Sequence, residues 1–204
     1  PPGLAGRGSP RTVVSSYLLS IGVNGSFYRV PTPAVRVSWV AQFDPGFRFT
    51  FKAHRRFTPA RTEPISRGEF EAFLAAVEPV ALTGMLACVL LQFPWSFRWS
   101  PGNLDWLAGV AEGLGRFPLA MEVRHDSWSC PEALVAVKAI GVNWCCIDQP
   151  RLAHCIGPEI RVTGAIGYVR LHGRRTETWF DSHGDSAARY DYLYGEGELS
   201  EWVA

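Results

Sequence analysis

Charged side chains are concentrated in residues 119–128 (LAMEVRHDSW), which place Glu122, Arg124 and His125 within four positions. Side chains two apart on a strand share a face, so Glu122 and Arg124 should point the same way. A carboxylate or a guanidinium taken out of water is costly unless it pairs or meets a ligand. This stretch therefore predicts either an internal salt bridge or a binding site.

Other predicted strands also end in polar or charged residues. These residues are Asn24, Lys52 with His54, Gln92, Asp148, and Arg170 with His172. In open α/β sheets and in (β/α) barrels the ligand site lies at the carboxyl ends of the strands, because the loops converge there. We therefore expect these side chains to line one site together with Glu122 and Arg124.

Positive charges at separate strand ends favour a small anionic or polyhydroxylated ligand, such as a sugar phosphate or a nucleotide. The residues that would hold the anion are Lys52, Arg124 and Arg170, with bidentate contacts from the arginines. Glu122 and Asp148 would hold hydroxyl groups or shuttle protons. His172 is the candidate acid or base, because histidine changes charge near neutral pH.

Other hypotheses fit the same residues. A divalent metal, which would make phosphodiester cleavage feasible, would use the ligand types found at the strand ends, namely His54, His125, His172, Glu122 and Asp148. Glu122 and Asp148 could instead be the acid and base of glycoside hydrolysis. Cationic strand ends with aromatic rims could form a nucleic-acid groove. Finally, the charges could be structural, in a non-catalytic protein.

The elements that must position these residues follow from hydrophobic periodicity and turn signals. Strands are expected over residues 20–24, 47–54, 85–93, 142–148 and 166–173, and from residue 119. Helices are expected over residues 12–19, 32–42, 66–80, 101–113 and 131–140, and from residue 198. This alternation predicts right-handed βαβ units and a parallel sheet. About six strands are expected, where a complete barrel needs eight.

The composition excludes several classes. Twenty Lys and Arg against nineteen Asp and Glu give a formal net charge of +1, so no global field indicates a dedicated nucleic-acid or membrane-surface binder. The five cysteines lack CxxC spacing and are expected to be reduced core residues. No apolar run reaches the roughly 18 to 20 residues that span a bilayer, and the first residues lack the pattern of a signal peptide. We expect one cytoplasmic domain without membrane contact.

Six segments, in chain order, resemble the YecE-like family, also called domain of unknown function 72. They are residues 20–31, 46–58, 90–104, 117–128, 147–150 and 168–173. The resemblance covers nearly the whole chain and implies an α/β fold, a TIM-type (β/α) barrel over residues 1–204, but it implies no particular reaction. The segments that would form the first and last strands are missing, so we expect an incomplete barrel.

Carried over by position, the resemblance points to a set of site residues. Candidates for substrate binding are Asn24, Tyr28, Lys52, Gln92, Arg124, His125, Trp128 and Arg170, and candidates for catalysis are Glu122, Asp148 and His172. Gly173 belongs to the same pattern. The HGRR motif at residues 172–175 could place Gly173 and two arginines against a phosphate, but it is expected to be a solvated turn. The chain departs from the family at Gly22, usually Glu, and at Pro59, usually His.

Overall fold

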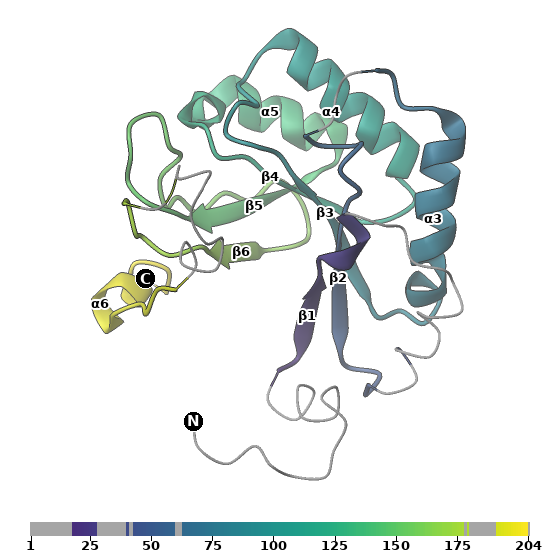
Figure 1. Ribbon diagram of the computed structural model, residues 1–204, viewed down its shortest axis with the longest axis horizontal. Helices are drawn as coiled ribbons and strands as arrows, with labels where there is room; N and C mark the ends of the chain where they lie inside the picture. The colour runs from purple at the N-terminus through teal and green to yellow at the C-terminus, as the bar shows by residue number, and fades with distance from the viewer. Residues whose placement is uncertain are drawn as a thin grey trace. The chain divides into compact units, whose positions relative to one another are not determined.

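The computed structural model describes residues 18–27, 40, 43–59, 63–177, 179 and 191–203. Within these residues, parallel strands follow one another along the chain, and helices lie between several of them (Figure 1). This order of elements is that of an incomplete TIM-type (β/α) barrel, which confirms the predicted fold class. The chain divides into two compact units, Pro1–Leu90 with Gly113–Pro118, and Leu91–Glu112 with Leu119–Ala204.

The first unit contains three strands that run parallel and pair in chain order. They are β1 (Ser20–Val23), β2 (Arg48–Lys52) and β3 (Leu86–Gln92), the last two residues of which belong to the second unit. A short 3-10 turn, η1 (Gly25–Phe27), follows β1. There the Ser26 hydroxyl donates to the Lys52 carbonyl at 2.7 Å, which ties the ends of β1 and β2 together.

The core of the first unit is aromatic. On β2 the predicted alternation is present, with Phe49 and Phe51 buried. Helix α3 (Arg67–Ala81) begins at a capping box, and its Phe73 meets the edge of the Phe57 ring at 5.4 Å between centroids. Phe57 also stacks on Phe70.

The second unit carries the charged strand ends. Along the chain it holds α4 (Pro101–Leu114, which ends in the first unit), β4 (Leu119–Glu122), the 3-10 turn η2 (Asp126–Ser129), α5 (Pro131–Ile140), β5 (Asn143–Asp148), β6 (Tyr168–Leu171) and α6 (Glu196–Ser200). Strand β5 is buried throughout and pairs in parallel with β4 and with β6. Helix α5 begins at Pro131 and ends at Gly141, whose φ of 80° is left-handed, as the sequence predicted.

Most predicted elements are found close to their predicted bounds. The last helix begins at Glu196 rather than at Glu198. The helices predicted over residues 12–19 and 32–42 lie almost wholly outside the described residues. All five cysteines are free thiols, three of them buried. No described helix combines the length and the apolar character that crossing a bilayer requires.

Candidate functional site

The centre of the candidate site is Glu122, the last residue of β4, whose side chain is fully buried. Its Oε1 accepts hydrogen bonds from Gln92 Nε2 at 2.8 Å and from Arg124 Nε at 3.2 Å and Nη2 at 3.1 Å. His172 Nε2 lies 3.1 Å from the same oxygen, and Arg170 Nη1 donates to Oε2. We call these five residues the Glu122 cluster. The second unit thus brings together five of the predicted site residues.

Strand periodicity explains why these side chains converge. Glu122 and Arg124 are two apart, as are Arg170 and His172, so each pair occupies one face of its strand. Leu171 lies between Arg170 and His172 in the chain and therefore occupies the other face of the strand, where it is 42% exposed. The backbone N–H of His172 donates to the Asp148 carbonyl at 2.8 Å, which continues the β5–β6 ladder and fixes the register of the cluster.

The Glu122 cluster carries excess positive charge. Two guanidinium groups and one carboxylate leave at least one net positive charge, whatever the charge of His172. Burial by itself raises the pKa of Glu122, but the charges of His172 and Arg124 outweigh burial and hold this pKa well below its usual range. Burial lowers the pKa of Arg170, yet the Glu122 carboxylate reverses the effect and raises it. Glu122 is therefore ionised at neutral pH.

Part of each arginine side chain remains accessible. The side chain of Arg124 is 14% exposed and that of Arg170 is 23% exposed, whereas Glu122 has no exposed surface. The Arg124 guanidinium lies 5.2 Å from the centroid of the Trp179 ring, and this ring also approaches His172 at 6.3 Å. Sequence reasoning did not assign Trp179 to the site, because it lies in an aperiodic segment. A ligand would meet the arginines rather than the carboxylate.

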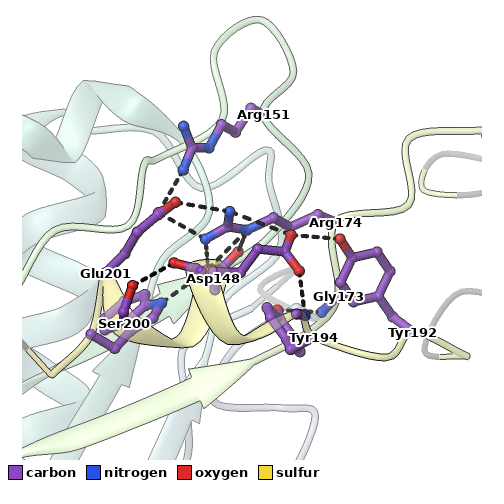
Figure 2. A network of polar contacts seen from close by, with 12 residues as sticks. Asp148, Arg151, Gly173, Arg174, Tyr192, Tyr194, Ser200 and Glu201 are labelled. Atoms are coloured by element: carbon purple, nitrogen blue, oxygen red, sulfur yellow. Dashed lines mark hydrogen bonds and ion pairs between the residues drawn. The ribbon is translucent and has the colours of Figure 1, made fainter.

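Asp148 belongs to a second polar network, shown in Figure 2. Its carboxylate accepts from Arg174 Nε at 2.9 Å and Nη2 at 2.6 Å, and from Trp202 Nε1 at 3.0 Å. Arg174 also donates to Glu201, which pairs with Arg151 at 2.7 Å. The prediction of a solvated turn at residues 172–175 is wrong for Arg174, because this side chain is 13% exposed and its hydrogen bond to Asp148 raises its pKa.

The residue after His172 completes this second network. The Gly173 N–H donates to the Tyr194 hydroxyl at 2.8 Å, and burial raises the pKa of Tyr194 to about 12. Gly173 has a φ of 87°, and a Cβ there would lie 2.7 Å from Cβ of Tyr192. Glycine is therefore required at this position. Asp148, Arg174 and Gly173 together hold the segment that contains α6, and we call this set the C-terminal network.

His125 faces a different environment. It caps η2, where its Nδ1 accepts the Ser127 N–H at 3.0 Å, and its ring lies against Trp95 at 4.9 Å. Nδ1 also lies 3.1 Å from Oδ1 of Asp126. Because Nδ1 accepts from Ser127, it carries no proton to share, and this contact is not an ion pair. Burial lowers the pKa of His125 and outweighs the negative charge of Asp126, which would raise this pKa.

Within the second unit, the predicted metal ligands are divided among different environments. Glu122 and His172 are engaged in the Glu122 cluster, and His54 lies in the first unit, where its Nδ1 accepts the Arg56 N–H at 3.4 Å. Among the described residues, the group with metal-ligand spacing consists of His125, Asp126 and His154. Sequence reasoning missed the last two, because His154 comes from a loop whose path no periodicity reveals.

The remaining predicted residues are not part of the Glu122 cluster. Asn24 is exposed and Lys52 is half-buried, at the ends of β1 and β2 in the first unit. Tyr28 lies outside the described residues. Trp128 is fully buried, and its indole N–H donates to the Phe97 carbonyl at 2.7 Å, so its ring contributes to packing. Roles in substrate binding stay predictions for these four.

Comparison with known proteins identifies relatives along the whole chain. The sequence profile described as "Protein of unknown function DUF72" matches residues 1–204. The UPF0759 protein YunF of Bacillus subtilis (strain 168) is 30% identical, over 92% of this chain and 71% of that protein.

Two solved structures share the fold. A DUF72 family protein from Thermotoga maritima MSB8 is 29% identical, with a TM-score of 0.82 over 96% of this chain and 76% of that one. A DUF72 family protein from Enterococcus faecalis V583 is 23% identical, with a TM-score of 0.83 over 95% and 78%. The chain therefore has the fold of these proteins over about three quarters of their length.

Proposed function

The chain belongs to the DUF72 family, and we propose that it binds a phosphorylated small molecule through Arg124, Arg170 and His172 at the carboxyl ends of β4 and β6. The observation that carries the proposal is the convergence of two arginines and a histidine on one fully buried carboxylate. One carboxylate cannot balance two guanidinium groups. A buried charge without a counter-charge is costly, so an anion from solvent would restore the balance.

The shape of the cations supports a phosphate group rather than a simple halide. Arginine presents several N–H donors in a planar fork, which matches the oxygens of a phosphate. Glu122 uses Nη1 of Arg170, and Nε and Nη2 of Arg124, and so holds both side chains in place. We therefore propose a positioning role for Glu122. Because its pKa is well below the usual range and its surface is fully covered, Glu122 is poorly suited to exchange protons with a substrate.

His172 is the member of the cluster best suited to proton transfer. Its ring contacts the Glu122 carboxylate, which fixes its orientation in the way that a carboxylate orients a catalytic histidine. We propose that any acid or base step on the bound ligand uses His172. Asp148 is less suited to that role, since Arg174 and Trp202 occupy both of its oxygens.

Isothermal titration calorimetry tests the binding proposal. The probes are inorganic phosphate, a hexose phosphate and the parent hexose. We expect the first two to bind the wild type and the hexose to bind much more weakly. Arg170→Gln should weaken phosphate binding, whereas Arg67→Gln, which removes the same charge from an exposed ion pair on α3, should not. Equal binding by both variants would rule out the Glu122 cluster as the site.

The salt dependence of binding separates a small ligand from nucleic acid. A single-stranded nucleic acid loses affinity with a slope of about −0.7 per phosphate contact in a plot of log K against log salt. Two accessible arginines would give a slope of roughly −1.4 by this rule. A clearly steeper slope with a short oligonucleotide would favour a nucleic-acid groove that extends beyond the cluster.

A further inference from the structure

A second group of side chains, outside the Glu122 cluster, has the chemistry of a metal site. His125 and Asp126 lie at the start of η2, and His154 comes from the loop after β5. Two imidazoles and one carboxylate are ligands that Zn²⁺ and Co²⁺ accept readily. One ligand atom from each residue lies within 4.8 Å of the other two.

Two of the distances between these side chains are close to those expected around a single ion. Bonds of about 2.0 to 2.2 Å to one metal place neighbouring ligand atoms about 3.0 to 3.5 Å apart. Nδ1 of His125 lies 3.1 Å from Oδ1 of Asp126, and Nδ1 of His154 lies 3.4 Å from Oδ2. The side chain of His154 is 68% exposed, so it can rotate to close the remaining gap. The ion would then be bound by both imidazoles and by the Asp126 carboxylate.

The backbone holds the three residues in this arrangement. The Asp126 N–H and the Trp95 indole N–H both donate to the His154 carbonyl at 3.1 Å. His154 also has a φ of 59°, a left-handed conformation that is uncommon for a residue other than glycine. The loop after β5 is thus fixed against η2 with its imidazole beside that of His125, at 5.7 Å between stacked rings.

We propose that His125, Asp126 and His154 bind a divalent transition-metal ion such as Zn²⁺, which fastens the loop after β5 to η2. The ion would take the Nδ1 lone pair of His125 that now accepts the Ser127 N–H. Binding therefore has a local signature, because the Ser127 amide loses its acceptor. The guanidinium of Arg98 lies 5.1 Å from the centroid of the Trp95 ring, and this ring packs against His125 at 4.9 Å, so a positive charge lies on the far side of Trp95 from His125 and would repel the ion.

Titration of the full chain with Co²⁺ at neutral pH tests this site, with visible absorption as the readout of coordination by nitrogen and oxygen. We expect one Co²⁺ per chain. His154→Asn should weaken binding by about 10-fold or more, because a ligand matters at least as much as an outer-shell partner. Asparagine tolerates the left-handed conformation, so this variant should stay folded. Asp126→Asn should weaken binding similarly, and His54→Ala should leave it unchanged.

Two further readouts distinguish a specific site from adventitious binding. In NMR spectra, at a Co²⁺ concentration that just saturates the wild type, the Ser127 amide should shift or broaden much more in the wild type than in His154→Asn. Arg98→Gln should tighten binding about twofold, because it removes a nearby like charge. Absence of coordinated Co²⁺ at millimolar concentration, or equal affinity in the wild type, His154→Asn and Asp126→Asn, would overturn the proposal.

Discussion

His172 Nε2 lies 3.1 Å from Oε1 of Glu122, although fifty positions separate the two residues in the chain. The contact joins the end of β4 to the residue that follows β6. Around it, Arg124 and Arg170 contact the same carboxylate and leave the cluster with excess positive charge. This arrangement leads to distinct expectations for the carboxylate and for each cation.

Replacing Glu122 by Gln should destabilise the fold strongly. The amide keeps the shape but leaves two largely buried arginine side chains without a counter-charge, and breaking a buried pair costs roughly 3 to 5 kcal/mol. Urea unfolding monitored by tryptophan fluorescence measures the loss. Glu71→Gln, which removes an exposed carboxylate paired with Arg67, serves as the control and should cost less than about 1 kcal/mol. Equal losses in the two variants would mean that Glu122 is not the anchor of the cluster.

Replacing Arg170 by Gln should leave stability nearly intact. Arg124 and His172 remain beside Glu122, and removal of one guanidinium lowers the excess positive charge of the cluster by one. We expect a change in unfolding free energy within about 1 kcal/mol, together with loss of phosphate binding. A loss as large as that of Glu122→Gln, with phosphate affinity retained, would instead assign Arg170 to the architecture.

Arg170→Lys separates charge from shape. Lysine keeps the positive charge but lacks the planar fork that can contact Glu122 and a phosphate at once. We expect phosphate affinity to fall by about 10-fold, which corresponds to the loss of one good charge-assisted contact. Calorimetric titration of this variant beside the wild type measures the change. If Arg170→Lys bound phosphate with wild-type affinity, the positive charge of the cluster would account for binding without the planar shape of the guanidinium.

The stabilising effect of Glu122 should disappear in acid. Its pKa in the folded protein lies well below its usual value, so as the pH falls the unfolded chain takes up the proton first. The contribution is therefore fully present above about pH 4.3, the ordinary glutamate pKa, and is lost as the pH falls below it. Unfolding free energies of the wild type and Glu122→Gln should differ by a constant amount above about pH 4.3 and converge as the pH falls from there toward the lower pKa of the folded protein. A difference that stays constant through this fall in pH would contradict the assignment.

Asp148→Asn should release the C-terminal network. The buried carboxylate holds Arg174 and Trp202, and loss of hydrogen bonds to a charged group costs about 1.5 to 3 kcal/mol. Amide exchange should rise over residues 191–203 before the rest of the second unit unfolds. Glu201→Gln, an exposed member of the same network, should have a much smaller effect. Unchanged exchange over this segment in Asp148→Asn would show that other contacts hold it.

Much of this arrangement could be predicted from strand periodicity alone. The two-residue spacing placed Glu122 beside Arg124 and Arg170 beside His172, and the polar strand ends predicted that the two pairs would meet. Contact residues from aperiodic segments were not predicted, since nothing in the local sequence of a loop indicates which part of the fold the loop contacts. Arg174 therefore looked solvated although it pairs with Asp148.

The lack of a periodic pattern in loops also explains why the proposed metal ligands were not predicted as a group. His125 was among the candidates because it adjoins a strand end, but its neighbours in space are Asp126 and a loop histidine, His154. The predicted set drew histidines from several strand ends on the assumption that all of them face one site. Side chains at adjacent positions point in different directions, and Arg124 and His125 are adjacent.

We propose that an oxyanion binds between Arg124 and Arg170. A crystal structure of the protein soaked in selenate, a phosphate-like anion with a strong anomalous signal, tests it most directly. We predict an anomalous peak within hydrogen-bond distance of both guanidinium groups, while both still contact Glu122, and no such peak in crystals of Arg170→Gln. Anomalous peaks elsewhere, with none between the two arginines, would contradict the account.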